Sequence, residues 1–251
     1  HDMHIEFENK TVVVTGGTRG IGAAMVEAFL ESGAMVYATG TDLQVLNELN
    51  KPVKSNTKPI EYLYLDFTLP DSVSDCLEKL SKLDRIDVLV NNAGVNKINP
   101  IDEIAEEDWD WINAVNLRGP FVVIRALAKK MKEQKSGRVV NISSIFGVVS
   151  KEKRAAYSTT KWGLIGLTKA IALDLAPDNI LVNAVSPGFV DTELTRRVLG
   201  QKGIDELVGK IPQLRLANCK EIAKTVLFLA SKHNTYITGQ NIIVDGGFTS
   251  V

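Results

Sequence analysis

Short apolar runs alternate with stretches of helical periodicity along nearly the whole chain. The first run, residues 10–14 (KTVVV), is rich in β-branched residues, which is typical of a buried parallel strand. The predicted strands are residues 10–14, 35–38, 61–65, 87–90, 138–142, 180–185 and 241–244. Because helical stretches separate them, the pattern predicts an α/β fold, a single doubly wound Rossmann-type domain. Its mostly parallel seven-stranded sheet has helices on both faces.

The length and composition agree with one domain. The chain has 251 residues, of which 45% are hydrophobic and 24% charged, enough for a sizeable core. No linker, repeat or low-complexity block divides residues 4–251. His1 and Asp2 precede Met3 and are interpreted as an expression scar. Residues 189–216 have no clean apolar period and are predicted to form a mobile lid over the substrate.

Charge and the scarcity of histidine exclude several classes of function. A net charge of −1 gives no pull toward nucleic acid or anionic lipid, and no apolar run approaches a membrane span. We therefore expect no nucleic acid or membrane partner and a cytoplasmic location. Cys76 and Cys219 are expected to be ordinary reduced residues. His233 has no helper nearby, which argues against a Ser-His-Asp hydrolase or a His-rich metal site; no metal is expected.

A glycine-rich turn, residues 15–22 (TGGTRGIG), joins the first strand to a helical stretch. A dinucleotide-binding loop requires this context, because a helix N-terminus offers free N–H groups and a positive dipole to a pyrophosphate. The glycines follow a G-x-x-x-G-x-G spacing. The predicted contacts in this turn are Gly16, Thr18, Arg19, Gly20, Ile21 and Gly22.

The end of the second strand bears on the choice between NADP(H) and NAD(H). An acidic residue there commonly binds the adenosine ribose hydroxyls. Gly40 leaves that place open, whereas Arg19 and Thr41 could meet a 2′-phosphate, so the sequence favours NADP(H). Asp42 lies close enough to keep NAD(H) as the alternative.

Two further strands end in residues suited to the same ligand. Asp66 could bond an adenine amino group or could instead cap a helix. Residues 91–94 (NNAG) have small side chains that permit close approach of the backbone to a ligand. The predicted contacts among them are Asn92, Ala93 and Gly94.

Tyr157 and Lys161 lie four residues apart in a predicted helix, so their side chains share one face. A lysine cation nearby is expected to lower the pKa of the tyrosine from about 10 and to give an acid/base group for an alcohol or carbonyl. Ser144 could hydrogen-bond the substrate oxygen. Such a pair also arises by chance, so it depends on the surrounding motifs.

A Gly-Pro pair interrupts the helical residues 102–133. Pro120 has no N–H, so the carbonyl of Asn116, four residues earlier, lacks its donor. That carbonyl could bind an ordered water; the alternative is a plain kink.

Together these motifs resemble the compact short-chain dehydrogenase/reductase family, from about Phe7 to Phe248. The resemblance rests on residues 15–22, Asp66, residues 91–94, Asn116, Ser144, residues 157–161 (YSTTK) and residues 187–192 (PGFVDT).

The resemblance implies a role for each matching residue. Tyr157 is expected to be the general acid/base, and Lys161 to lower its pKa while holding the nicotinamide ribose. Ser144, rather than Ser143, is expected to orient and polarise the carbonyl. The main-chain carbonyl of Asn116 is expected to anchor a relay water.

The family also implies hydride transfer between a nicotinamide ring and the carbon that carries the oxygen, without a metal. Such enzymes commonly form homotetramers through the helices at 104–133 and 157–176 and the C-terminal strand. The expected contacts of the nicotinamide carboxamide are Pro187, Gly188, Val190 and Thr192.

The closest subfamily resemblance is to 3-oxoacyl-[acyl-carrier-protein] reductases, which implies a 3-oxoacyl thioester substrate. Asp178 stands where that subfamily often has arginine, and Lys135 is the remaining candidate contact for a carrier protein. The alternative is an NAD(H)-using polyol, sugar-acid or other secondary-alcohol dehydrogenase, which the Gly40-Thr41-Asp42 turn resembles. A dinucleotide-binding sensor without turnover is disfavoured, because Ser144, Tyr157 and Lys161 are all present.

Two groups of cations flank the predicted cleft. They could meet an anionic substrate or could form a solvated face. They are Lys151, Lys153, Arg154, Arg196 and Arg197.

Overall fold

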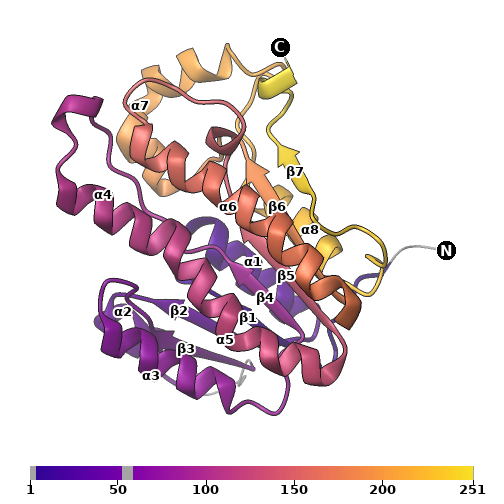
Figure 1. Ribbon diagram of the computed structural model, residues 1–251. Coiled ribbons are helices and arrows are strands. Elements are labelled where there is room, and N and C mark those ends of the chain that lie inside the picture. The colour runs from indigo at the N-terminus through magenta and orange to yellow at the C-terminus, as the bar shows by residue number, and fades with distance from the viewer. Residues whose placement is uncertain (1–3, 53–58, 251) are drawn as a thin grey trace.

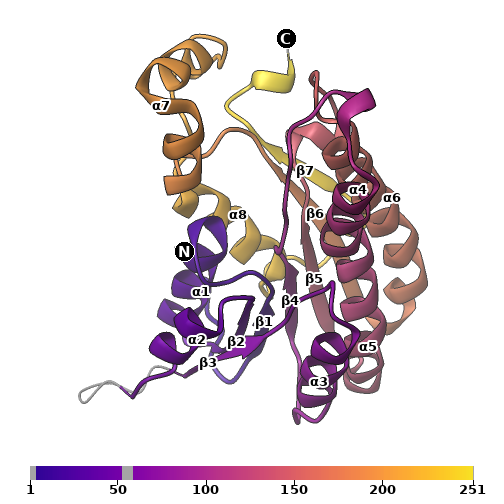
Figure 2. The same ribbon diagram turned by 90° about the vertical axis from the view of Figure 1, so that its left-hand side faces the viewer.

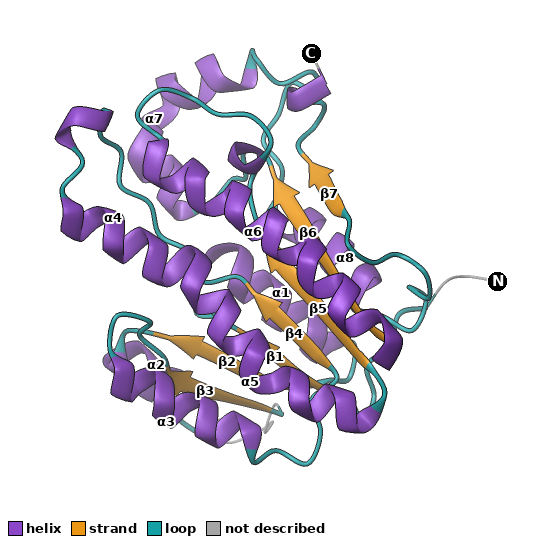
Figure 3. Ribbon diagram, in the orientation of Figure 1, coloured by secondary structure: helices purple, strands orange, loops and turns teal. Residues whose placement is uncertain are grey.

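The computed structural model describes residues 4–52 and 59–250. One sheet of seven parallel strands runs through it in the order β3-β2-β1-β4-β5-β6-β7 (Figure 3). The predicted α/β doubly wound fold is therefore confirmed. The strands are β1 (Thr11–Val14), β2 (Met35–Gly40), β3 (Ile60–Tyr64), β4 (Val88–Asn91), β5 (Gly137–Ile142), β6 (Ile180–Pro187) and β7 (Asn241–Val244).

Helices cover both faces of the sheet. Seen along its edge, α1, α2 and α8 lie on one side and α3, α4, α5 and α6 on the other (Figure 2). The helices are α1 (Gly20–Glu31), α2 (Leu43–Leu49), α3 (Pro70–Ser81), α4 (Glu106–Asn113), α5 (Gly119–Gln134), α6 (Ala155–Leu175), α7 (Glu193–Val208) and α8 (Cys219–Ala230).

The central strands are apolar on both sides because each side packs on helices. Successive side chains of a strand point to opposite faces. Val12 and Val14 accordingly belong to the core beneath α1 and α8, whereas Val13 belongs to the core beneath α3, α5 and α6. This arrangement explains why the strands are continuous apolar runs rather than alternating ones.

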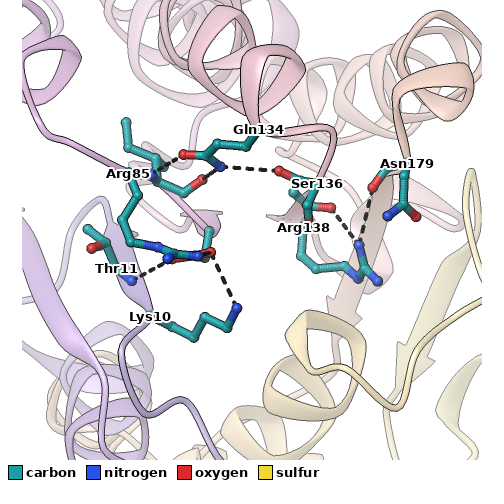
Figure 4. A network of polar contacts seen from close by, with 10 residues as sticks. Lys10, Thr11, Arg85, Gln134, Ser136, Arg138 and Asn179 are labelled. Carbon is teal, nitrogen blue, oxygen red and sulfur yellow. Dashed lines mark hydrogen bonds and ion pairs between the residues drawn. The ribbon is translucent and has the colours of Figure 1, made fainter.

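A polar network joins the amino ends of β1, β4 and β5 (Figure 4). Arg85 holds Asp87 in a bidentate ion pair at 2.6 and 2.7 Å, and the main-chain N–H of Thr11 donates to Asp87 at 2.8 Å. Gln134, at the end of α5, bonds both the N–H and the carbonyl of Ile86. These contacts hold the amino ends of the strands together. The candidate site lies at the opposite end, where the carboxyl ends of the strands meet.

Three segments differ from the sequence predictions. Helix α2 was not expected. Residues 189–216, predicted as a lid without regular structure, contain α7, which lies beyond the carboxyl end of β6 and bends at Gly200, where φ is 61° (Figure 1). Residues 102–133 divide into a 3₁₀ turn η1 (Ile101–Glu103), α4, a π-helical turn η2 (Ala114–Arg118) and α5. Within the described ranges, no helix is long and apolar enough to cross a membrane.

Candidate active site

The predicted site residues gather at the carboxyl edge of the sheet. The glycine turn follows β1, residues 91–94 end and follow β4, Ser143 and Ser144 follow β5, and residues 187–192 end and follow β6. Because β1 and β4 are neighbours whose connections leave in opposite directions, a crevice forms at this edge, where α/β folds bind ligands.

Two of these loops are bonded into one unit. The hydroxyl of Thr15 accepts the main-chain N–H groups of Asn92 and Ala93 at 3.0 and 3.1 Å. The Asn92 amide donates to the carbonyl of Gly16 at 2.9 Å. A Cβ at Gly22 would collide with that carbonyl, so glycine is required for helix α1 to lie this close to the turn.

The N-terminus of α1 suits a pyrophosphate. Arg19 is its N-cap residue and no side chain caps it, and the first turn carries no acidic group. The first N–H groups of the helix are therefore available to an anion, and the dipole reinforces them. The methyl carbon of Thr192 lies 3.9 Å from where a Cβ of Gly20 would be, which places the loop after β6 beside this turn. The residues present thus fit a dinucleotide.

The ribose end of the crevice has no room for an acidic side chain at position 40. A Cβ at Gly40 would lie 2.7 Å from the Thr18 methyl carbon. Asp42, the sequence's argument for NAD(H), is the N-cap of α2 and accepts the N–H groups of Gln44 and Val45 at 3.0 and 3.1 Å. One oxygen of its carboxylate, Oδ1, is therefore engaged in holding that helix.

Asp66 is not a helix cap, because Leu69 occupies the N-cap position of α3. One oxygen of the Asp66 carboxylate accepts both the main-chain N–H and the hydroxyl of Thr68, at 2.9 and 2.6 Å. The hydroxyl of Ser72 accepts the main-chain N–H of Asp66. The residue is thereby fixed at the carboxyl end of β3.

Tyr157 and Lys161 lie on α6 beside the end of β5. The Lys161 ammonium is 5.5 Å from the centre of the Tyr157 ring and donates to the carbonyl of Ile142 at 2.9 Å. Ser144 is buried, and its hydroxyl accepts the N–H of Phe146. Ser143 is also buried, but it donates to the carbonyl of Lys161 at 3.0 Å and so serves the packing of α6 on β5.

Burial is the largest cause of the pKa shifts of Tyr157 and Lys161. It raises the pKa of the Tyr157 phenol above 10.0, although a hydrogen bond with Ser144 and the charge of Arg154 act to lower it. Burial also lowers the pKa of Lys161 to about 8. The expectation that Lys161 lowers the pKa of Tyr157 is therefore not met in this structure. The reason is that removing both groups from water disfavours both charged forms.

Asn116 sits in the π turn and is completely buried. Its side-chain oxygen accepts the N–H of Val95 and its side-chain NH₂ donates to the Val95 carbonyl, each at 2.8 Å. The same NH₂ group also donates to the Thr160 hydroxyl at 3.2 Å. A Cβ at Gly94 would lie 3.5 Å from the Lys161 ammonium. The loop after β4, the π turn and α6 therefore meet at one point.

The predicted kink at Pro120 takes the form of this π turn. The N–H of Gly119 donates to the carbonyl of Ala114, five residues earlier rather than four. Single π turns of this kind are frequent at functional sites.

The loop after β6 is anchored at both ends. The N–H of Gly188 donates to the carbonyl of Val244 on β7 at 2.9 Å, and Val190 forms an isolated bridge with Ala217. Thr192 is the N-cap of α7, where its hydroxyl accepts the N–H of Thr195. Pro187 is the last residue of β6.

An aromatic row beside Tyr157 was missed by the sequence reasoning. The Phe146 ring lies 6.5 Å from the Tyr157 ring and 6.2 Å from the Phe189 ring, and Phe189 lies 5.1 Å from Phe248. Their positions directly after β5, β6 and β7 were the available signal, since the carboxyl ends of parallel strands share one edge.

The candidate cations have different surroundings. Arg196 pairs with Asp191 through two contacts of 2.6 Å. Lys135, the candidate carrier-protein contact, pairs with Asp178 at 2.5 Å. Both lie just before β5 and β6, at the opposite edge of the sheet from Tyr157. Arg197 is exposed in α7.

Comparisons with known proteins agree with this geometry. A family model described as Enoyl-(Acyl carrier protein) reductase matches residues 16–249. The 3-oxoacyl-[acyl-carrier-protein] reductase FabG of Thermotoga maritima is 38% identical, covering 97% of this chain and 99% of its own. The chain belongs to the short-chain dehydrogenase/reductase family. It is therefore an NAD(P)-dependent oxidoreductase that interconverts a carbonyl and an alcohol of a small-molecule substrate, as the motifs predicted.

Other relatives are named for different activities. Cyclopentanol dehydrogenase of a Comamonas species is 34% identical, covering 96% of this chain and 98% of its own. Among solved structures, a gluconate 5-dehydrogenase from Burkholderia cenocepacia in complex with NADP and tartrate has a TM-score of 0.91 and 29% identity, covering 99% of this chain and 98% of that one. The family thus shares this fold among several substrates.

Proposed function

We propose that the enzyme uses NADP(H) to interconvert a ketone and a secondary alcohol, with Tyr157 exchanging the proton of the substrate oxygen. The observation that carries the proposal is the convergence of Tyr157, Lys161, Ser144 and Asn116 at the carboxyl edge of the sheet, beside the uncapped α1 N-terminus. When bound, the nicotinamide supplies or accepts the hydride.

Each side chain has a distinct task in this proposal. Ser144 holds the substrate oxygen, and Tyr157 delivers a proton to it during reduction. A phenol whose pKa is raised by burial stays protonated at neutral pH and is thus ready to donate. Lys161 holds the nicotinamide ribose, and the Asn116 carbonyl, deprived of a donor by Pro120, holds a relay water.

Three features support NADP(H) over NAD(H). Gly40 lacks both an acidic group and the room for one, and Asp42 is engaged as a helix cap. Arg19 is exposed at the edge of the crevice, and in the described part of the chain it forms no ion pair. Its guanidinium is therefore free to bind a 2′-phosphate, together with Thr41.

The first substrate candidate is a 3-oxoacyl thioester. Its support is the 38–39% identity, over nearly full length, to two 3-oxoacyl-[acyl-carrier-protein] reductases. The second candidate, a sugar acid or other secondary alcohol, is favoured by one specific observation. Asp178 places a carboxylate where such reductases often have arginine, and it pairs with Lys135 and Lys132, so this position offers an acidic carrier protein fewer cations.

We also propose that the enzyme assembles as a homotetramer. Trp162 and Leu173 lie eleven residues apart on one face of α6 and are 54% and 77% exposed, and Phe121 on the neighbouring α5 is 45% exposed. Large apolar side chains on a continuous helical surface are typical of a protein interface. The cytoplasmic location predicted from the sequence stays a prediction.

A substrate panel tests the function. Acetoacetyl thioester is offered with NADPH, and polyols and sugar acids with NADP⁺, to the unaltered protein and to Tyr157→Phe. We expect turnover of at least one class, its loss in Tyr157→Phe, and NADPH affinity within about threefold of the original. Substantial turnover by Tyr157→Phe would refute the assigned proton donor.

A further inference from the structure

The three cations that precede α6 differ sharply in their surroundings. Lys151 is exposed and pairs with exposed Glu152 at 3.8 Å. Lys153 is also exposed, on left-handed backbone with φ 62°. Arg154 is instead partly buried, with its guanidinium carbon 5.9 Å from the centre of the Phe146 ring. Only Arg154 therefore turns toward the site.

Arg154 adjoins the reacting group on two sides. It is the N-cap residue of α6, three residues before Tyr157, and its carbonyl accepts the N–H of Ser158 at 2.8 Å. Its guanidinium stacks on Phe146, whose ring meets the Tyr157 ring edge to face at 6.5 Å. The cation thus lies against the aromatic row next to the Tyr157 phenol.

The guanidinium has no acceptor of its own. Across residues 4–52 and 59–250, the Arg154 side chain forms no ion pair and no hydrogen bond, although it has five N–H donors. A partly buried, unpaired cation is costly, and stacking on an aromatic ring compensates only in part. Elsewhere in the lid region, Arg196 and Arg215 are held by bidentate carboxylates at 2.6 to 2.8 Å.

We propose that Arg154 binds a carboxylate of the substrate, so that the enzyme acts on oxo acids and the corresponding hydroxy acids. This inference rests on the proposed function, because it concerns the same site. Arginine suits the role since its planar fork receives a carboxylate through two parallel hydrogen bonds. The Phe146 ring supplies apolar surface beside that fork and limits its hydration, and Phe189 and Phe248 continue the aromatic row beyond it.

The electrostatics of the site support the same reading. The charge of Arg154 lowers the pKa of Tyr157, so the two groups lie within effective Coulombic reach of one another. A carboxylate paired with Arg154 would therefore lie close to the phenol that exchanges the proton. This is the relation expected when the acid group and the reacting carbonyl belong to one small molecule.

Matched acids and esters test the inference. Oxo acids with the carbonyl at carbon 2, 3, 4 or 5 are each compared with their methyl esters, with the unaltered enzyme, Arg154→Gln, Arg154→Lys and the control Lys153→Gln. We expect the unaltered enzyme to prefer at least one acid over its ester. Arg154→Gln should lower kcat/KM for that acid by about 10- to 100-fold, and for the ester by less than about threefold. For that acid, kcat/KM of Arg154→Lys should lie between those of the unaltered enzyme and Arg154→Gln, and kcat/KM of Lys153→Gln should match that of the unaltered enzyme.

Equal losses for acid and ester would overturn the inference, as would an unaltered enzyme that prefers the esters. Unchanged melting temperature and NADPH affinity in Arg154→Gln would show that the loss is not one of folding.

A binding measurement separates this inference from the proposed function. The proposed function fails only if no class of the substrate panel is turned over, whereas the role of Arg154 can be decided without turnover. Calorimetric titration of malonate into the enzyme with NADP⁺ still decides the role of Arg154. Binding that Arg154→Gln weakens by at least about tenfold supports it. Equal binding by both proteins, or none by the unaltered enzyme, overturns it.

Discussion

Asn116 and Val95 are joined by a reciprocal pair of hydrogen bonds, each 2.8 Å long. Asn116→Ala would leave both main-chain groups of Val95 without partners and would open a small cavity in the π turn. We expect the free energy of unfolding to fall by about 2 kcal/mol, with a large loss of turnover. Urea unfolding measures the first effect. Asn113→Ala, which removes only a bond to Trp109 near the surface, is the control; equal stability of the two variants would contradict this role.

Lys161 imposes a cost on the fold that disappears at high pH. Its pKa in the folded protein is about 8, below the 10.5 of an ordinary lysine, so folding disfavours its protonated form. The protein should therefore gain stability as pH rises from about 8 to 10.5, by up to about 3 kcal/mol from this group.

Lys161→Met removes that cost. We expect the variant to unfold at higher urea than the original protein at pH 7 and this advantage to shrink toward pH 10.5, while turnover is lost. Lys169→Met, at an exposed position of the same helix, should show no such pH-dependent difference. An advantage independent of pH would show that packing, not charge, is responsible.

The direction of the reaction should depend on the protonation of Tyr157. Reduction needs the phenol protonated, and burial raises its pKa, so kcat/KM for reduction should hold through neutral pH and fall only in the alkaline range. Oxidation needs the phenolate, so kcat/KM for oxidation should rise with pH. Because the hydrogen bond with Ser144 lowers the pKa of Tyr157, Ser144→Ala should move both inflections upward. Ser143→Ala should leave them in place; a downward shift in Ser144→Ala would be inconsistent with this origin.

Arg19 should determine most of the preference for NADPH. Arg19→Ala removes the exposed guanidinium at the start of α1 and should weaken NADPH binding by about 10- to 100-fold while NADH binding changes little. Fluorescence titration with NADPH and with NADH measures the difference between the two affinities. Arg125→Ala, at an exposed position of α5, serves as the control. Equal affinity for NADPH and NADH in the unaltered protein would argue for the NAD(H)-using alternative.

Leu173 provides a direct test of assembly. Its side chain is 77% exposed in a single chain, so Leu173→Glu should not disturb the monomer fold. We expect light scattering to report a tetramer for the original protein and a smaller species for the variant. A control is Lys169→Glu, on the same helix. A monomeric original protein would refute the proposed assembly.

The central strands could be predicted because each is a short apolar run buried on both faces. The outer strands β3 and β7 are only partly buried, but they are still short runs rich in apolar residues. Helix α2 could not, since only Leu46 among its seven residues is buried and it therefore has no apolar stripe. Helix α7 has no buried residue at all, so its helical form leaves no periodic trace in the sequence. Asp42 kept NAD(H) as an alternative in the sequence analysis because its role as a cap depends on that unseen helix.

The candidate site, like the fold, could be predicted from the sequence only in part. Spacing was enough to bring Tyr157 and Lys161 onto one helical face, but it says nothing about how much water reaches them. The pKa shifts therefore had the unexpected direction, because burial is the largest cause of both. The pairing of Phe146 with Phe189 joins residues after different strands, which only the completed sheet brings together.

The π turn at Ala114–Arg118 gives this helix one residue more than a regular α-helix would need. Each residue of a helix turns the next by about 100°. The π turn winds more slowly and so absorbs most of the rotation that an added residue would bring, which keeps Val123 and Leu127 facing the core. Deleting one residue here would restore regular pairing and leave the buried face of α5 nearly unchanged. It would, however, withdraw the bulged main chain that presents Asn116 to Val95. The extra residue in this turn therefore serves the site rather than the core.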